Sequence, residues 1–458
     1  MRHLVVVGFL ASVLMIASVS GNYDYAEVIE KSLLFYEAQR TGYLPPDNRI
    51  PWRGDSFVTD VGDDGEDLTG GYFSSEGFAK FQFPAASTMT FLAWGMYDSK
   101  EGYEKSGQWE NALACLRWGM DYLIKTHPSP NVLYVQVGNG TENWGFWGRP
   151  EEWTGSNPRS TLKATRDFPA SEVAAEQAAA MSAAAMVFRD NGDREYANTL
   201  LTHAVQLYTF ATRFRGHYNE SFPEVAQFYN SWSGFADEFL WSAAWLFRAT
   251  GKPFYRAQYN QWWTEFGLSW RPSQASWDLK LAQAQVLLAR IDGSPQYVNA
   301  ARTFCDWAAN EAPKTPLGLF YAGDWGTNRY AANVVYVCLQ AARIGINAES
   351  YLEFADSQIG YMLGDTGRSF VVGFGNNPPV NPRHSASSCP DRPAPCDWNN
   401  YDTDEPNHQT LFGALVGGPD RNDQYNDRRT EAQMNRVSLD YNSGFQSSVA
   451  ELCALYCD

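Results

Sequence analysis

The sequence predicts a large all-α protein with a single domain, and two observations carry this prediction. Apolar residues recur at helical spacing through almost the whole chain of 458 residues. No Gly/Ser-rich linker or low-complexity tract divides the chain, although its length could hold two or three average domains. A hydrophobic content of 44% is sufficient for one large core. We therefore expect one domain over residues 22–458.

The expected helices are stretches whose apolar residues fall at positions i, i+3, i+4 and i+7. In chain order they cover residues 25–39, 85–97, 108–125, 171–189, 194–213, 237–249, 253–265, 279–289, 295–310, 330–342, 348–363 and 439–456. The connections at 73–83, 138–168, 364–409 and 417–433 are long and rich in Gly, Pro, Asn, Asp and aromatic residues. Because long loops inside a compact domain are usually functional, we expect the site on these loops.

The N-terminus has the pattern of a secretory signal peptide. Arg2 and His3 precede an apolar run at 4–17, and small residues follow through Gly21. We therefore expect residues 1–21 to be a signal peptide and the mature protein to be extracellular. An Asn-Gly-Thr sequon at Asn139 and an Asn-Glu-Ser sequon at Asn219 agree with secretion and are candidate glycosylation sites.

Charge excludes some classes of partner. The formal net charge of −17 argues against nucleic acid, because phosphate backbones bind basic surfaces. No stretch after the N-terminal run reaches the roughly 20 apolar residues of a membrane span, so no membrane partner is expected. We expect a monomer that requires no cofactor.

Seven cysteines leave at least one thiol unpaired within the chain. Cys389 and Cys396 flank a Pro-rich loop and are the best candidates for a disulfide in a secreted protein. Cys115, Cys305 and Cys338 lie in apolar helical patterns, which favours buried thiols.

Aromatic residues make up 15% of the chain, with 17 Trp and 25 Tyr. Such an excess fits two roles about equally well, because amphipathic rings suit both. The rings either fill a large core or line a cleft as platforms for stacked sugars.

Several motifs carry a resemblance to a known family. They are WRGDS at 52–56, DLTGGYFSSEGFAKF at 67–81, WGRPE at 147–151, GDTGRSFVVGFG at 364–375 and GALVGGPD at 413–420. In sequence and spacing they resemble the family 9 glycoside hydrolases, mostly endo-β-1,4-glucanases (cellulases), and most of all the secreted animal enzymes that lack a cellulose-binding module. The resemblance runs from about residue 24 to 457 and implies an (α/α)6 barrel, where periodicity alone predicts only a large all-α fold.

The resemblance also implies that the catalytic base has been lost. Enzymes of this family hydrolyse with inversion, which requires one carboxylate as base and one carboxylic acid as proton donor. The family's loop after Gly-Gly-Trp/Tyr-Tyr reads Asp-Ala-Gly-Asp, and its two aspartates hold and activate the water. Ser74 and Gly77 occupy their positions. A serine hydroxyl does not accept a proton at neutral pH, and glycine supplies no group.

The position of the general acid is also substituted. The second family signature corresponds to YNDRRTEAQMNRVSLDYNS at 425–443, in which Asp427 is retained and Arg436 occupies the position of the acid. A guanidinium is charged at any working pH and does not donate a proton to a glycosidic oxygen.

Two further family motifs are altered. The sugar-binding Pro-His-x-Arg motif has Arg383 at the His position and Ser385 at the Arg position, with His384 between them. The family's Asp-His pair before WGRP is Asn143-Trp144. The departures fall on three loops expected to meet at one site, while the framework around them is intact. This contrast predicts a folded protein without hydrolytic activity.

Other residues are candidates for binding. By the resemblance and their place in loops or at helix ends, candidate substrate-binding residues are Trp147, Trp232, Trp277, Trp325, Tyr425, Arg383 and His384, although core packing is an equal alternative for the aromatic ones. In the family, acidic residues near the matches of Glu172, Glu176 and Asp237 help bind calcium. These three are candidate ligands of a structural Ca²⁺, because hard oxygen ligands suit that ion. Stabilisation of a helix N-terminus is the alternative for Asp237.

Three functions remain open from the sequence. The first is a secreted, inactive family 9 homologue that retains β-glucan binding. The second is an active endoglucanase with relocated carboxylates, in which Glu76 serves as base and Asp427 or Glu431 as acid. The third is a secreted structural or partner-binding protein with no role in sugar recognition.

Overall fold

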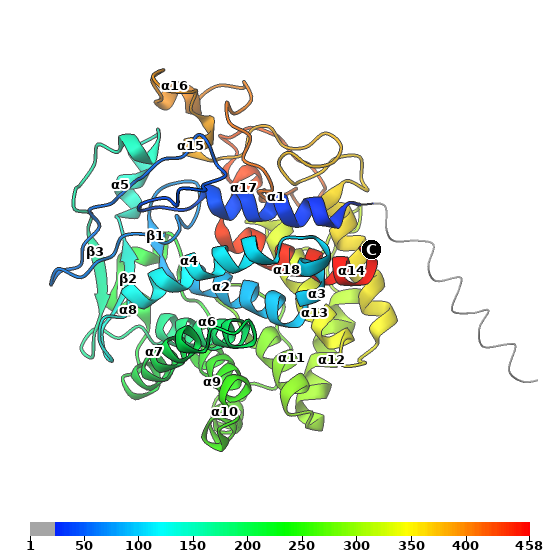
Figure 1. Cartoon of the computed structure of the whole chain (residues 1–458). Coiled ribbons are helices and arrows are strands. Elements are labelled where there is room, and N and C mark those ends of the chain that lie inside the picture. The colour runs from blue at the N-terminus through cyan, green and yellow to red at the C-terminus, as the bar shows by residue number, and fades with distance from the viewer. Residues whose placement is uncertain (1–22) are drawn as a thin grey trace, which may run out of the picture.

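Twelve long helices form two concentric layers in the computed structural model, which describes residues 23–458 (Figure 1). The predicted signal peptide at 1–21 lies outside the described residues. The inner layer consists of α2 (Gln82–Asp98), α6 (Ser171–Asp190), α9 (Ala236–Thr250), α11 (Leu281–Ile291), α13 (Thr327–Ala342) and α18 (Leu439–Tyr456). Each inner helix contacts the next, and α18 returns to contact α2, so the ring closes.

The outer layer alternates with the inner one along the chain. It consists of α1 (Tyr25–Ala38), α4 (Trp109–Lys125), α7 (Arg194–Arg213), α10 (Pro253–Glu265), α12 (Pro295–Asn310) and α14 (Ala348–Leu363). All twelve expected helices are present, with bounds within three residues of the prediction. Alternating inner and outer helices in a closed ring make an (α/α)6 barrel, as expected.

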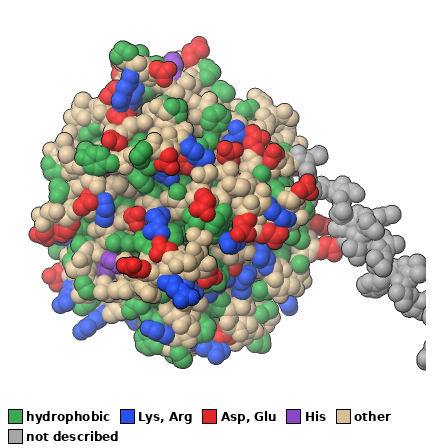
Figure 2. Space-filling view, in the orientation of Figure 1, with side chains coloured by type: hydrophobic (Ala, Val, Ile, Leu, Met, Phe, Trp, Pro, Cys, Tyr) green, Lys and Arg blue, Asp and Glu red, His purple; other side chains and the backbone are tan. Residues whose placement is uncertain are grey.

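The sequence of each helix explains its layer. Inner helix α6 is buried on nearly every side and is rich in alanine, which allows close approach to its neighbours. Outer helix α4 buries one stripe, including Leu113, Leu116, Met120 and Leu123, and exposes the opposite face. Acidic and basic side chains are interspersed over the face of the molecule in Figure 2.

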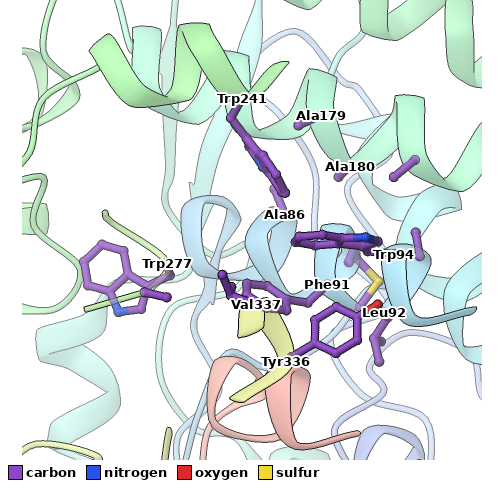
Figure 3. Close-up of a cluster of buried hydrophobic side chains, with 14 of the residues drawn as sticks. Ala86, Phe91, Leu92, Trp94, Ala179, Ala180, Trp241, Trp277, Tyr336 and Val337 are labelled. Carbon is purple, nitrogen blue, oxygen red and sulfur yellow. The ribbon is translucent and has the colours of Figure 1, made fainter. Parts of the chain in front are cut away.

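Large rings fill the interior of the barrel (Figure 3). Trp94 of α2 is fully buried, and its ring centroid lies 5.4 Å from that of Trp241 on α9 and 5.2 Å from that of Tyr336 on α13. Ala179 and Ala180 of α6 leave space for these rings. Part of the aromatic excess therefore serves the core.

The loops contain structure that the sequence did not predict. An antiparallel sheet in the order β1-β2-β3 is formed by β1 (Lys80–Phe81), β2 (Leu133–Val137) and β3 (Thr161–Ala164). Short helical segments are α3 (Lys100–Lys105), α5 (Gly140–Trp144), η1 (Pro150–Glu152), α8 (Tyr218–Ser221), η2 (Pro223–Gln227), α15 (Ser385–Ser388), α16 (Trp398–Tyr401) and α17 (Ala432–Asn435). The fold is therefore α-helical with a minor sheet.

The loops ahead of the inner helices gather at one end of the barrel, which we call the mouth. Because inner and outer helices alternate, all six inner helices start at this end. The segment before α2 meets the start of α18 there, since Ser438 Oγ and the Leu439 N–H both donate to the Ser74 carbonyl, at 2.8 and 3.0 Å. The opposite end, where the inner helices finish, we call the far end.

The cysteine predictions were partly correct. The expected disulfide between Cys389 and Cys396 is present. The expectation of buried thiols was wrong for Cys305 and Cys338, which form a disulfide that joins α12 to α13. Their apolar helical surroundings are the same for a thiol and for a buried disulfide. A third disulfide joins Cys453 and Cys457, and Cys115 is a buried free thiol. No helix within residues 23–458 has both the length and the apolar character required to cross a membrane.

Candidate functional site

A pocket of about 170 Å³ opens at the mouth. It is lined by residues from the segment before and in β1, the α5 region, η2, the segment before α15, α16 and the segment before α18. These residues are Ser75, Glu76, Gly77, Ala79, Phe81, Gly140, Asn143, Trp144, Phe146, Trp147, Gln227, Phe228, Arg383, Ser385, Trp398 and Arg436. The altered motifs at 74–77, 143–144, 383–385 and 436 therefore meet in one place.

Aromatic side chains form the walls of the pocket. Trp144 is 53% exposed, and its ring packs against Phe228 with centroids 4.7 Å apart. Trp398 is 44% exposed and lies 5.9 Å from the more buried Trp147, centroid to centroid. Exposed rings beside a pocket provide flat apolar faces of the kind that sugars stack on.

Three charged side chains form the floor. Glu76 Oε2 lies 3.1 Å from Arg436 Nε, and Glu76 Oε1 lies 3.6 Å from Arg383 Nε. Burial alone would raise the pKa of this carboxyl, but the two guanidinium charges outweigh burial and lower the pKa of Glu76. The carboxyl is therefore ionised at neutral pH, and one carboxylate serves two arginines.

The backbone holds the two arginines next to each other. Arg383 and Arg436 form an isolated parallel bridge, in which the Arg383 N–H donates to the Asn435 carbonyl at 2.7 Å. The Arg436 carbonyl accepts the Gly417 N–H at 3.0 Å, which ties the same segment to the loop after α14. The side chains on the floor therefore start from fixed main-chain positions.

The remaining guanidinium contacts are polar and incomplete. Arg436 Nη2 donates to Ser75 Oγ at 3.1 Å and to the Tyr229 hydroxyl at 3.5 Å. Arg383 Nη1 donates to the Tyr401 hydroxyl at 2.7 Å and to the Arg429 carbonyl at 3.3 Å. Within residues 23–458, Arg436 Nη1 and Arg383 Nη2 donate no hydrogen bond, so each guanidinium keeps donors for a ligand.

The two positions predicted to have lost aspartates differ in their surroundings. Ser74 is 1% exposed, and its hydroxyl accepts the Phe81 N–H at 2.8 Å, so it serves the local backbone. Gly77 lines the pocket, where an added Cβ would lie 3.6 Å from the nearest atom, in Asn143. Position 77 therefore has room for a side chain.

The carboxylates predicted as substitutes do not converge on Glu76. Asp427 accepts the N–H groups of Val380 at 2.8 Å and Asn381 at 3.1 Å, outside the pocket lining. Glu431 is exposed at the N-cap position of α17. Among the described residues that line the pocket, Glu76 is the only carboxylate. Asp427 and Glu431 therefore lie outside the set of residues that lines the pocket with Glu76.

His384 lies behind the pocket and is not among its lining residues. Its ring is 2% exposed, with Nδ1 accepting the Ser387 N–H at 3.1 Å and Nε2 lying 2.9 Å from Gln39 Oε1. Because Nδ1 accepts, the proton of the neutral ring sits on Nε2 and is donated to Gln39. Burial, aided by the charge of Arg53, lowers the pKa of His384 to about 3. His384 therefore caps α15 rather than contacting a ligand.

The other predicted aromatic platforms lie outside the pocket. Trp277 is 5% exposed and packs edge-on against Phe83 and Tyr229, so its position supports a packing role. Trp232 and Trp325 are exposed by 70% and 47% but do not line the pocket, so stacking there stays a prediction.

Tyr425 is also outside the pocket lining. Its hydroxyl donates to Asn435 Oδ1 at 2.5 Å, and the Arg368 guanidinium lies 4.4 Å from the ring centroid. Through Asn435, Tyr425 supports the segment that carries Arg436.

The three candidate calcium ligands each accept a hydrogen bond from the protein, and calcium binding by them stays a prediction. Glu172 accepts the Tyr218 N–H at 3.0 Å, and Glu176 accepts the Thr90 hydroxyl at 2.7 Å. Asp237 accepts the Lys280 N–H at 2.6 Å, and burial raises its pKa to about 7. Within residues 23–458 no group of three or more His, Cys, Asp or Glu side chains is arranged to hold a metal ion.

The two sequons differ in exposure. Asn139 is exposed beside the pocket and caps α5, with its Oδ1 accepting the N–H groups of Thr141 and Glu142 at 2.8 and 3.1 Å. Asn219 is half-buried, and its Nδ2 donates to Asn230 Oδ1 at 2.8 Å. Glycosylation of both stays a prediction, and Asn219 would have to lose this bond.

Sequence reasoning missed pocket aromatics, among them Phe146, Phe228 and Trp398. Trp398 follows the predicted Cys389–Cys396 loop directly, so that disulfide was a usable signal for an ordered ring nearby. Phe228 had no such signal, because it is placed by packing on Trp144 and Phe81, which lie far from it in the sequence.

Comparisons with known proteins agree with this architecture. The model of glycosyl hydrolase family 9 matches residues 25–449. The chain is 39% identical over 451 residues to Endoglucanase A of Bacillus pumilus, across 95% of this chain and 67% of that protein. It is 41% identical over 458 residues to Endoglucanase B of Cellulomonas fimi, across 96% of this chain and 43% of that protein. The chain thus spans about two thirds of the first relative and less than half of the second.

Two solved structures are similar over nearly the whole chain. An endoglucanase of the termite Nasutitermes takasagoensis is 48% identical with a TM-score of 0.93, across 95% of this chain and 99% of that one. A cellulase of C. cellulolyticum, solved in complex with cellobiose, is 31% identical with a TM-score of 0.88, across 95% of this chain and 100% of that one.

Proposed function

Because this chain belongs to glycosyl hydrolase family 9, we propose that it is a secreted endoglucanase-like protein that binds β-1,4-glucan without hydrolysing it. Inverting hydrolysis requires two carboxyl groups about 6.5–9.5 Å apart, with room for a water molecule between them. One observation carries the proposal: Glu76 is the only carboxylate among the described residues lining the pocket, and both of its oxygens face arginines.

The chemistry of the floor argues against proton transfer. The two guanidinium neighbours lower the pKa of Glu76, which makes its carboxylate a weaker base. Arg436 stays protonated at working pH and has no proton to give to a leaving oxygen. Neither the general base nor the general acid of an inverting hydrolysis is therefore provided by the pocket floor.

The same pocket retains what glucan binding requires. Exposed rings of Trp144 and Trp398 offer stacking faces, and unused guanidinium donors are available to sugar hydroxyls. The related cellulase solved with cellobiose supports a saccharide as the ligand class. The N-terminal run at 1–21 supports secretion, which N-terminal sequencing of protein collected from the culture medium tests.

A reducing-sugar assay with carboxymethyl-cellulose tests the loss of hydrolysis, and calorimetry with cellotetraose tests binding. We expect no turnover above buffer and measurable binding. The assay is repeated with Glu76→Gln, which removes the carboxylate but keeps the shape of the side chain. Turnover in the unchanged protein that Glu76→Gln abolishes would overturn the proposal. Absence of binding would remove the role in glucan recognition.

A gain-of-function variant gives the converse test. Ser74→Asp, Gly77→Asp and Arg436→Glu together restore the carboxylates of the family pattern, with Glu76→Gly to remove the displaced one. We expect this variant to acquire measurable turnover. The matched control carries Asn, Asn and Gln at positions 74, 77 and 436, and should stay inactive. If turnover is equal in both, the substitutions are not the cause of inactivity.

A further inference from the structure

The floor of the pocket carries an excess of positive charge. Arg383 and Arg436 contribute two positive charges and Glu76 one negative charge, and no other Asp, Glu, Lys or Arg is among the described lining residues. The three side chains are only 17%, 20% and 13% exposed, so water and salt screen them weakly. The local charge is therefore positive, although the net charge of the whole chain is −17.

Each of the two guanidinium groups uses some of its N–H groups within the protein and leaves others open. Glu76 faces the Nε atom of each arginine, and Ser75 and Tyr401 accept from one terminal nitrogen of Arg436 and Arg383, respectively. The second terminal nitrogen of each arginine donates no hydrogen bond within residues 23–458. Glu76 neutralises one of the two positive charges. The remaining positive charge and the two open guanidinium edges are suited to one anionic group.

An apolar platform adjoins these donors. The Arg383 guanidinium carbon lies 5.1 Å from the ring centroid of Tyr401 and 5.9 Å from that of Trp147. Trp398 continues this platform, with its ring 5.3 Å from Tyr401 and 44% exposed. A ligand that fits both features has a flat apolar ring face and a carboxylate on the edge of that ring.

We propose that the pocket selects a β-linked saccharide containing a hexuronic acid over neutral β-1,4-glucan. The carboxylate binds the open edges of Arg436 and Arg383, and the pyranose face stacks on the wall that contains Trp398. The inference rests on the proposed function, since it names the preferred ligand of the same pocket. A neutral glucan gains the stacking contact but leaves the excess positive charge without a partner.

The test compares two ligands that differ only at C6. Cellotetraose is neutral, and the β-1,4-linked tetramer of glucuronic acid has the same linkage with a carboxylate on each ring. Calorimetry at about 0.15 M salt should show about tenfold tighter binding of the acidic tetramer, the difference between a charge-assisted and a neutral hydrogen bond. This preference should shrink at about 1 M salt.

Variants separate a local effect from a general one. Arg436→Gln should reduce the preference to near unity, because it weakens binding of the acidic tetramer more than binding of cellotetraose. Arg194→Gln, at the exposed start of α7, changes the net charge of the chain by the same amount and should keep the preference. Circular dichroism checks that each variant is folded, and Arg383→Gln replaces Arg436→Gln if the latter fails to fold.

Each outcome decides between the two claims. Equal affinity for both tetramers in the unchanged protein overturns the inference and leaves glucan binding intact. Binding of neither tetramer overturns both. A preference that Arg194→Gln reduces as much as Arg436→Gln does would assign it to overall charge and overturn the role of the pocket.

Discussion

One carboxylate at the mouth of this barrel and one at the far end are each shared by two arginines. At the far end, Asp98 at the end of α2 accepts from Arg248 at 2.6 and 2.9 Å and from Trp94 at 2.7 Å, and it lies 3.0 Å from Arg290. It is 2% exposed in its side chain and saturated with donors.

At the mouth, the contacts of Glu76 with its arginines are 3.1 and 3.6 Å long, and Glu76 Oε2 and Arg383 Nε have no hydrogen bond of good geometry. The same combination of one carboxylate and two arginines thus has a different role at each end of the barrel. The far-end cluster links the C-terminal ends of α2, α9 and α11. Arg248 and Arg290 also interact favourably there with the dipoles of their helices. The mouth cluster stays incomplete, as expected of groups that await a ligand.

The largest effect that bears on this comparison is expected from removal of the far-end carboxylate. Asp98→Ala leaves Arg248 and Arg290 without a counter-charge in a buried setting. We expect the free energy of unfolding to fall by about 3–5 kcal/mol. Urea denaturation followed by tryptophan fluorescence measures it, and a loss below about 1 kcal/mol would mean that the far-end cluster is not structural.

Acid should lower the stability of the folded protein through His384. The pKa of His384 in the folded protein is about 3, against about 6.5 when unfolded, so the unfolded state binds a proton first as pH falls. Its contribution to stability is complete above about pH 6.5 and declines toward pH 3. Between roughly pH 7 and pH 5 we expect the titration of His384 to lower the free energy of unfolding by about 2 kcal/mol.

The variant His384→Gln should reduce this pH dependence, which urea denaturation at the two pH values measures. His408→Gln, at an exposed histidine, is the matched control and should leave the dependence unchanged. A dependence that survives His384→Gln in full would exclude His384 as its source. Some dependence remains in any case, because burial and the neighbouring His203 also lower the pKa of His127 to about 3.

Removal of the mouth carboxylate should cost less than removal of Asp98. In Glu76→Ala, both arginines keep their contacts with Ser75 and Tyr401 and part of their exposure to the pocket. We expect a loss of about 0.5–1.5 kcal/mol in the free energy of unfolding. If the loss matches that of Asp98→Ala under the same conditions, the contrast between the two clusters is wrong.

The smallest expected effect concerns the pocket wall. Trp144→Ala removes an exposed stacking face and should weaken cellotetraose binding about three- to fivefold, or about 0.6–1 kcal/mol. Trp144→Phe is the matched control, since it keeps an aromatic face and should retain most of the affinity. Unchanged affinity in Trp144→Ala, measured by calorimetry, would place the sugar elsewhere.

Local periodicity was sufficient to predict all twelve long helices, because the recurrence of apolar residues at helical spacing depends on nearby residues only. It did not predict the sheet, since β2 is a run of five residues whose partners lie far along the chain. The disulfide between Cys305 and Cys338 was missed for a similar reason. Pairing depends on the packing of α12 against α13, which the sequence does not express locally.

The sequence predicted which positions lie at the site better than it predicted the contacts between their side chains. The resemblance located positions 77, 383 and 436, which do line one pocket. The alternative of an active enzyme gave Glu76 the role of base, whereas the structure places Arg383 and Arg436 beside Glu76. Glu76 and Arg436 are far apart in sequence, and only the closed barrel brings the segment before α2 to the start of α18.

The bridge between Arg383 and Arg436 has a thermodynamic consequence. It fixes the backbone of both positively charged positions before any sugar arrives, so docking freezes few additional degrees of freedom in the protein. Such preorganisation predicts association close to the ordinary protein–ligand encounter rate, with no slow ordering step. Bound and free crystals should then superimpose at the floor, and affinity should be set by how slowly the sugar leaves.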